Sequence, residues 1–271
     1  MKHNKYVVSL LALLVVATIC IVAAGNQSQN YKLAYNFDNG DKFNYKISSV
    51  ENPEKAFTEN IEMLVTDIAK NNISMQVTSV TKINGNETND SYNVNMTSSG
   101  NLIQSNSKNL TIPEIQPELP NMLEYPSKEI GKGYTWTTTY DKVGNYTSTG
   151  QLVEYNLSSM TKHRCLGPKT ISVDAGNFDC VGIENDVNFS LNMATKDSNK
   201  TVYTTIIGNT SGESWVDLKG GFLVKSEYDS KKLEDIDSSS LYKEIGLDKF
   251  YREVPINSHP VCELVNIQKR E

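Results

Sequence analysis

The sequence predicts a mainly β protein, a curved antiparallel meander in the form of a half-open barrel or sandwich, with a short C-terminal helix and an N-terminal hydrophobic helix. Three observations support this fold class. Apolar and polar residues alternate with a period of two along most of the chain, turn residues such as Asn84-Gly85 separate the alternating runs, and helix signals are confined to the C-terminal tail. Such alternation gives each strand one buried, apolar face and one solvent-exposed, polar face. This is typical of antiparallel sheets and argues against a parallel α/β sheet.

The chain begins with an export segment. Lys2 and Lys5 precede an uncharged, mostly apolar run from Tyr6 to Ala24, after which the sequence becomes small and polar. This order is typical of a signal peptide. As a helix the run reaches about 28 Å, nearly the thickness of the hydrocarbon core of a bilayer, so a retained anchor formed by residues 6–24 is the alternative. We therefore expect residues 1–25 to be a signal peptide or membrane anchor, and residues 26–271 to be an extracytoplasmic β domain, secreted or anchored to the cell membrane.

The expected strands follow from residue 31 onward. A turn at residues 38–41 predicts a hairpin of Tyr31–Phe37 with Lys42–Val50. Further alternating runs lie at residues 73–77, 92–96, 134–140, 153–157, 187–193 and 215–228. A proline-rich connector at 106–130 divides the meander into halves at 31–105 and 131–228. The halves form one continuous sheet with a covering loop, or a duplicated β unit, since residues 40–45 resemble residues 131–136.

The tail, residues 229–271, carries the helix signals. Asp237 or Ser238 is a suitable N-cap, Leu241 and Ile245 are spaced for one helical face, and Gly246 follows as a stop. The sequence therefore predicts a short helix that packs on the sheet.

The charge of the exported part is acidic. Without Lys2 and Lys5 it has 24 basic and 32 acidic residues, a net charge of about −8, and no long basic cluster. This balance argues against a nucleic-acid partner and against attachment to a membrane other than through the N-terminal segment.

Asn-x-Ser/Thr triplets are frequent, and each is an acceptor for an N-glycan in an exported protein. They lie at Asn26, Asn72, Asn86, Asn89, Asn95, Asn109, Asn145, Asn156, Asn188, Asn199 and Asn209. The alternative is that a polar β surface rich in Asn, Ser and Thr forms such triplets without modification. The last sixty residues carry none, which makes the C-terminal end the better candidate for a contact face.

Three cysteines follow the export segment. We expect Cys165 and Cys180 to form a disulfide, because they flank the 168–177 hairpin, which leaves Cys262 as the odd thiol. A zinc site is the alternative, and its ligands would come from His163, His259 and the three cysteines. Only His259 and Cys262 have a common ligand spacing, so we expect neither a metal nor a cofactor.

Two segments resemble a pattern in secreted, uncharacterised β proteins of bacteria and archaea. Residues 125–136 are similar to a Pro-x-Lys-x-(Val/Ile)-x-x-Gly-x-x-Trp entry into a strand, and residues 171–180 are similar to a Val-x-Val-x-Ala-Gly-x-Phe-x-Cys hairpin. Members of this group often have an architecture like that of the lipoprotein carriers LolA and LolB, with a curved sheet and an apolar concave face. The resemblance implies binding rather than catalysis.

Motifs for catalysis are absent: the sequence has no Gly-x-Ser-x-Gly, no His-Glu-x-x-His and no phosphate-binding glycine loop. We therefore expect a non-enzymatic, N-glycosylated protein of the cell envelope that is a surface, structural or binding module for an envelope protein or a glycan. The first alternative is a carrier of an apolar ligand or lipid on a concave face that includes Phe43, Tyr45, Trp136, Tyr155 and Phe189. The second is a hydrolase, in which His163 or His259 meets an acid and a nucleophile in a cleft.

Overall fold

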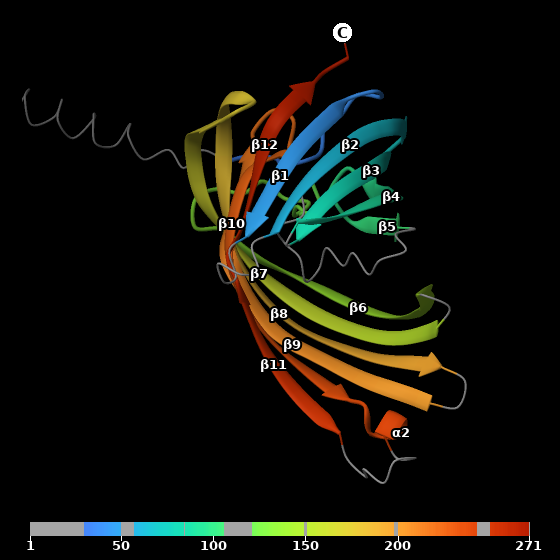
Figure 1. Ribbon diagram of the computed structural model, residues 1–271. Coiled ribbons are helices and arrows are strands. Elements are labelled where there is room, and N and C mark those ends of the chain that lie inside the picture. Colours follow the sequence, from blue (N-terminus) through green and yellow to red (C-terminus); the bar gives the residue numbers. More distant parts are fainter. Residues whose placement is uncertain are drawn as a thin grey trace, which may run out of the picture.

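The computed structural model describes residues 30–49, 57–83, 85–105, 121–148, 151–197, 200–242 and 250–270. In these residues one antiparallel sheet of twelve strands curls into a half-barrel (Figure 1). The mainly β, antiparallel and curved fold class predicted from the sequence is thus confirmed. Among the same residues, no helix has the length and apolar character needed to cross a membrane.

The strands of the sheet are joined mostly by short turns, as expected for a meander. In chain order they are β1 (Lys42–Ser49), β2 (Phe57–Ala69), β3 (Asn72–Ile83), β4 (Asn86–Thr97), β5 (Leu102–Ser105), β6 (Thr135–Ser148), β7 (Gln151–Val173), β8 (Gly176–Asp197), β9 (Lys200–Asp217), β10 (Leu223–Asp237), β11 (Tyr251–Ser258) and β12 (Pro260–Gln268). Their spatial order is β5-β4-β3-β2-β1-β12-β10-β9-β8-β7-β6, and β11 pairs with the second half of β10.

Figure 1 shows that the curled sheet has two lobes. The upper lobe contains β1 to β5 and β12, the lower lobe contains β6 and β11, and the long strands β7 to β10 run through both. The register of β7 against β8 shifts between Cys165 and Gly167, and that of β10 against β9 shifts between Leu223 and Lys225. Bulges of this kind bend a strand, and Cys165 and Leu223 beside them belong to the main hydrophobic core.

Two non-strand segments of the chain cover the inner face of the upper lobe. Residues 31–38 and 121–130 pack against the inner face of the sheet and belong to the main hydrophobic core. The hydroxyl of Tyr35 joins them, because it donates to the Leu123 carbonyl at 3.0 Å and accepts from the Leu123 amide at 2.9 Å. Buried Asn121 accepts hydrogen bonds from the Leu223 amide at 2.8 Å and from Tyr45 at 3.2 Å.

The lower lobe has a separate, smaller core. Leu157, Val187, Phe189 and Leu191 are buried there on the inner face of β7 and β8. Tyr140, Tyr155, Met193 and Ile206 pack against them. The two cores are distinct clusters, so the line between the lobes is not part of a continuous apolar interior.

The structure differs from the sequence prediction at two elements. Residues 32–38 are not a strand of a hairpin; only Tyr31 makes an isolated bridge, to Ile130, because this segment lies across the inner face of the upper lobe. Of the predicted C-terminal helix the structure describes only α2 (Ser239–Tyr242), since residues 243–249 lie outside the described residues, and the tail also forms two strands that were not predicted, β11 and β12. The predicted N-terminal helix lies outside the described residues.

The two predicted halves correspond to β1–β5 and to β6–β10, which all belong to the same sheet. The segment between them includes residues 121–130, which cover the inner face of the upper lobe. The division of residues 26–271 into domains, and the duplication, stay predictions.

Candidate functional site

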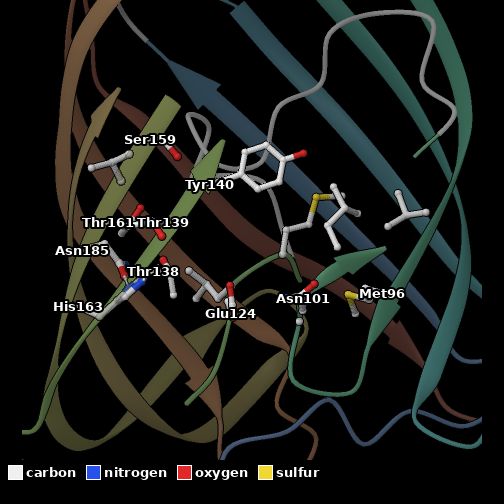
Figure 2. A pocket seen from close by; sticks show the side chains of 16 residues that line it. Met96, Asn101, Glu124, Thr138, Thr139, Tyr140, Ser159, Thr161, His163 and Asn185 are labelled. Atoms are coloured by element: carbon white, nitrogen blue, oxygen red, sulfur yellow. Dashed lines mark hydrogen bonds between the residues drawn. The ribbon is translucent and has the colours of Figure 1, made fainter. Parts of the chain in front are cut away.

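A cleft lies on the inner face of the sheet, where the two lobes meet, and has a volume of about 120 Å³. One side includes apolar groups from β4, β5 and residues 121–130, among them Met96, Leu102 and Met122. The other side consists of polar groups from β6, β7 and β8. Figure 2 shows Thr138, His163 and Asn185 close together on this side, with Met96 across from them.

Alternation along the strands aims these side chains into the cleft. In β8 the side chains of Ile183, Asn185, Val187 and Phe189 are all buried on one face, whereas Asn188 is exposed on the other. Asn185 therefore takes a position that the strand pattern reserves for an apolar residue. His163 takes such a position in β7, where it is only 4% exposed.

A row of hydrogen-bonded polar side chains crosses five neighbouring strands at the level of the cleft. We call this set, Thr138, His163, Asn185, Ser214 and Tyr228, the polar row. The Asn185 side-chain amide donates to the Tyr228 hydroxyl at 2.7 Å and to Ser214 at 3.3 Å, and Ser214 and Tyr228 are 2.6 Å apart. Burying a polar group costs free energy when it has no hydrogen-bond partner. The hydrogen bonds within the polar row offset this cost between the two apolar cores.

Gly212 makes room for the polar row. It faces Asn185 on one side and Tyr228 on the other in the strand register. A Cβ atom on Gly212 would lie 2.6 Å from the Tyr228 ring and 2.1 Å from the Glu227 carbonyl oxygen. A side chain here is therefore incompatible with the position of Tyr228.

His163 is the residue of the polar row whose side chain most commonly acts as an acid or a base in proteins. Its Nδ1 atom is 2.7 Å from Asn185 Oδ1, its Nε2 atom is 3.0 Å from Thr138 Oγ1, and its ring stacks on Trp136 at 4.7 Å. Burial lowers the pKa of His163 to about 4, against the opposing effect of the hydrogen bond to Asn185. The imidazole is consequently neutral at physiological pH.

The arrangement Thr138–His163–Asn185 has the order of a nucleophile, a base and an orienting group. An effective general base needs a pKa near the working pH, and a pKa of about 4 makes His163 a weak one. The second histidine considered for a hydrolase, His259, lies exposed at the junction of β11 and β12. It contacts Asp229 at 2.8 Å and Glu227 at 3.2 Å, and the hydrogen bond to Asp229 is the main cause of its raised pKa.

The five residues predicted for a ligand-binding face are divided among three places. Phe43 and Tyr45 are fully enclosed in the core of the upper lobe, where the rings of Phe37 and Phe222 pack on Phe43. Phe189 and Tyr155 belong to the lower core, whereas Trp136 stacks on His163 beside the cleft. The side chains that line the cleft itself are different ones.

Most of the predicted glycan acceptors lie on the surface. Asn72, Asn86, Asn89, Asn145, Asn156, Asn188 and Asn209 are exposed and Asn95 is half-buried. Asn188 lies between Val187 and Phe189, and Asn95 lies between Val94 and Met96, so both side chains point away from the cleft. Asn26, Asn109 and Asn199 lie outside the described residues.

The structure lacks the predicted disulfide between Cys165 and Cys180, and both thiols are buried. The register explains this difference: Cys165 pairs with Ile183, three residues along β8 from Cys180. At about 3.4 Å per residue this offset puts the two Cα atoms roughly 10 Å apart, beyond the reach of a disulfide. Cys262 is also buried, in β12. Within the described residues, no three Asp, Glu, His or Cys side chains are grouped as metal ligands.

Sequence reasoning considered His163 only as a metal ligand or hydrolase base, and it missed Thr138 and Asn185. A usable signal was present, because extending the alternation of Val187, Phe189 and Leu191 back along the strand puts Asn185 on the buried face. The contribution of Met96 and Met122 could not be found this way, since both are ordinary apolar residues of distant segments.

Comparisons with known proteins give little to add. No family matches the sequence, and no curated protein does either. Two similar solved structures are a predicted exported protein with a YmcC-like fold from Bacteroides fragilis and a predicted lipoprotein from Parabacteroides distasonis. The first is 12% identical with a TM-score of 0.35 and covers 88% of this chain and 99% of its own. The second is 13% identical with a TM-score of 0.38 and covers 89% and 100%. At these TM-scores neither likeness says anything about the function of this chain.

Proposed function

We propose that this chain is a non-enzymatic, extracytoplasmic protein of the cell envelope that binds a small amphipathic ligand in the cleft between its lobes. The observation that carries the proposal is the two-sided lining of the cleft. Met96, Leu102 and Met122 form an apolar side, and Thr138, His163 and Asn185 of the polar row form a hydrogen-bonding side. Concave sites with a largely apolar lining and a few placed polar groups are typical of small-molecule binding.

The size of the cleft limits the part of the ligand that it encloses. An apolar cavity of about 150 Å³ holds one benzene ring, so a cleft of about 120 Å³ encloses a group of similar or slightly smaller size. The rest of a larger ligand would extend along the inner face of the lower lobe, towards Phe189 and Tyr155.

The absence of enzymatic activity is part of this proposal. It is supported by the polar row, in which the hydrogen bonds of His163 are made within the protein and burial lowers its pKa to about 4. A base of this strength is poorly matched to proton transfer near neutral pH.

N-glycosylation of the outer face is also part of the proposal. It is supported by the exposure of the acceptor asparagines and by Asn188 and Asn95, which point away from the cleft. Glycans at these positions would leave the cleft accessible. Mass spectrometry of the protein from its native host tests this directly: we expect glycopeptides that contain Asn156 or Asn188, and unmodified peptides for all eleven acceptors would refute it.

Binding is tested by NMR on the full chain carrying [13C-methyl]methionine, titrated with hexan-1-ol as the probe. We expect the methyl signals of Met96 and Met122, which line the cleft, to shift, while those of Met63 and Met75, which do not line it, stay unchanged. Equal shifts at all four methyl groups, or none, would refute binding in the cleft.

Two variants on opposite faces of β7 sharpen this test. Thr161 lines the cleft, whereas its neighbour Lys162 is exposed on the outer face. We expect Thr161→Phe to abolish the hexan-1-ol shifts because the ring fills the cleft, and Lys162→Phe to keep them. If both variants bind as the unmodified protein does, the probe occupies another place.

A second candidate function, the carriage of an apolar ligand or lipid, is favoured by the lower core. Leu157, Val187, Phe189 and Leu191 lie on the inner face beside the cleft. A carrier, unlike a receptor, should accelerate the transfer of a fluorescent lipid between two populations of vesicles. A transfer rate equal to that of the Thr161→Phe variant would exclude carriage.

A further inference from the structure

The direction of the hydrogen bonds in the polar row determines what the cleft offers to a ligand. The starting point is the orientation of the Asn185 amide group. Its Nδ2 atom lies 3.3 Å from the backbone carbonyl of Ile183, which only accepts hydrogen bonds, and 2.7 Å from the Tyr228 hydroxyl. The nitrogen therefore belongs on this side, and the amide oxygen faces His163.

The amide oxygen fixes the tautomer of His163. Asn185 Oδ1 accepts at 2.7 Å from His163 Nδ1, so Nδ1 carries the hydrogen. A neutral imidazole has only one N–H, and Nε2 is left as an acceptor. The low pKa of His163, caused by burial, keeps the ring in this neutral form.

The unprotonated Nε2 atom of His163 in turn orients the Thr138 hydroxyl. Thr138 Oγ1 lies 3.0 Å from His163 Nε2 and must donate its only hydrogen there. This bond uses neither of the two lone pairs of the oxygen, and Thr138 lines the cleft, so an acceptor is left for a ligand. A ligand atom in contact with Thr138 Oγ1 therefore has to donate a hydrogen bond. An ether or carbonyl oxygen at this place would be repelled, because its lone pairs would face those of Oγ1.

We propose that the ligand of the cleft is an uncharged molecule with a hydroxyl group on an apolar body, and that Thr138 accepts the hydrogen bond of this hydroxyl. The inference rests on the proposed binding function and adds the chemical class of the ligand. Met96, Leu102 and Met122 contact the apolar body from the opposite side.

The lining favours a hydroxyl over a charged donor such as an ammonium group. Ser159 and Thr161 also line this side of the cleft, and both carry neutral hydroxyls. Glu124 is the one acidic residue of the described lining, and it is exposed to solvent rather than buried. A cation on Thr138 would lose its hydration without a buried counter-charge.

The test compares two isomers, butan-1-ol and 1-methoxypropane, which differ in whether the oxygen carries a hydrogen. Each is titrated into the full chain labelled with [13C-methyl]methionine, and the dissociation constant is read from the Met96 and Met122 methyl shifts. We expect the alcohol to bind about tenfold more tightly, as the loss of one hydrogen bond to a neutral group implies.

Variants on the two faces of β6 complete the design. Thr138→Val removes the acceptor but keeps the shape, and it should lower the affinity for butan-1-ol to that for the ether. Thr138→Ser should keep the preference. Thr137→Val, on the exposed face of the same strand, is the matched control and should change neither affinity.

The outcomes separate the two proposals. If both isomers shift the Met96 and Met122 signals with equal affinity, the cleft binds ligands but the hydroxyl inference is wrong. If neither isomer shifts them, the proposed binding function fails as well. If Thr138→Val does not fold, the isomer comparison in the unmodified protein and in Thr138→Ser still decides.

Discussion

The ammonium group of Lys269 lies 2.5 Å from the Oδ2 atom of Asp41, a carboxylate that is completely buried. The same ammonium lies over the rings of Phe37, Phe43 and Phe222, at 5.3 to 5.7 Å from their centres. The C-terminal end of β12 is thereby tied to the turn that precedes β1. The backbone amide of Asp38 also donates to Asp41, at 2.9 Å.

Replacement of Lys269 should destabilise the protein. Lys269→Met keeps contact with the three rings but leaves the Asp41 carboxylate buried without its counter-charge, and we expect a loss of about 2 kcal/mol in the free energy of unfolding. Urea denaturation measures it. Lys42→Met, which breaks the half-exposed pair with Glu62, is the control and should cost less than about 1 kcal/mol. Equal losses in both variants would contradict the special role of Lys269.

The buried His163 should make stability depend on pH. Its folded pKa of about 4 lies below the unfolded value of 6.5, so between these values the unfolded state binds the proton first. Stability should therefore fall as the pH decreases from 6.5 towards 4, by on the order of 3 kcal/mol from this group alone. Denaturation curves of the unmodified protein and of His163→Gln at pH 7 and pH 4.5 isolate the contribution. A pH dependence unchanged in the variant would show that His163 does not titrate as described.

The cysteines should react slowly in the folded protein. Burial raises the pKa of Cys165, and burial together with Asp217 and Asp179 raises that of Cys180 to about 12, so neither forms the reactive thiolate readily. We expect iodoacetamide to leave both unmodified in native protein and to alkylate them in urea, as read by peptide mass spectrometry. A peptide that links Cys165 to Cys180 before reduction would instead support the disulfide that the sequence suggested.

Gly221 and Gly85 form a matched pair for a test of close packing. Both have a positive φ, 70° and 82°, but a Cβ on Gly221 would lie 1.9 Å from the Ala34 carbonyl oxygen, whereas Gly85 has no atom within 4 Å. We expect Gly85→Ala to cost about 1 kcal/mol from backbone conformation alone. Gly221→Ala should cost at least about 3 kcal/mol or prevent folding, because residues 31–38 would have to leave the sheet. Similar melting temperatures of the two variants would contradict this.

The alternation of apolar residues predicted the strands well, because each inner face is buried locally and leaves a mark in the sequence. Phe43, Tyr45 and Ile47 of β1 are all buried, as their period of two implies. The register could not be predicted: β12 lies between β1 and β10, and pairing over more than two hundred residues has no local signal. The predicted disulfide failed for a different reason: it depended on the offset between β7 and β8, two strands of one hairpin in which Cys165 pairs with Ile183 and not with Cys180.

The candidate site was harder to predict than the fold. Thr138, His163 and Asn185 come from three strands, and the side opposite them comes from β4, β5 and a proline-rich segment that the sequence marked only as a connector. Asn121 illustrates the difficulty, since it is buried inside the upper lobe with a positive φ of 57°. Nothing in its neighbourhood of prolines and glutamates indicates burial.

The place of β12 also constrains how the protein is made. It follows the other described strands in the chain, yet within the described residues the sheet runs from β1 to β10 only through it. The strands β1 to β5 and β6 to β10 can each form hairpins during synthesis, but the two groups share no edge until β12 is made. A nascent chain without β12 therefore cannot complete the half-barrel, and the pairing that joins β1 to β10 is a late step of folding.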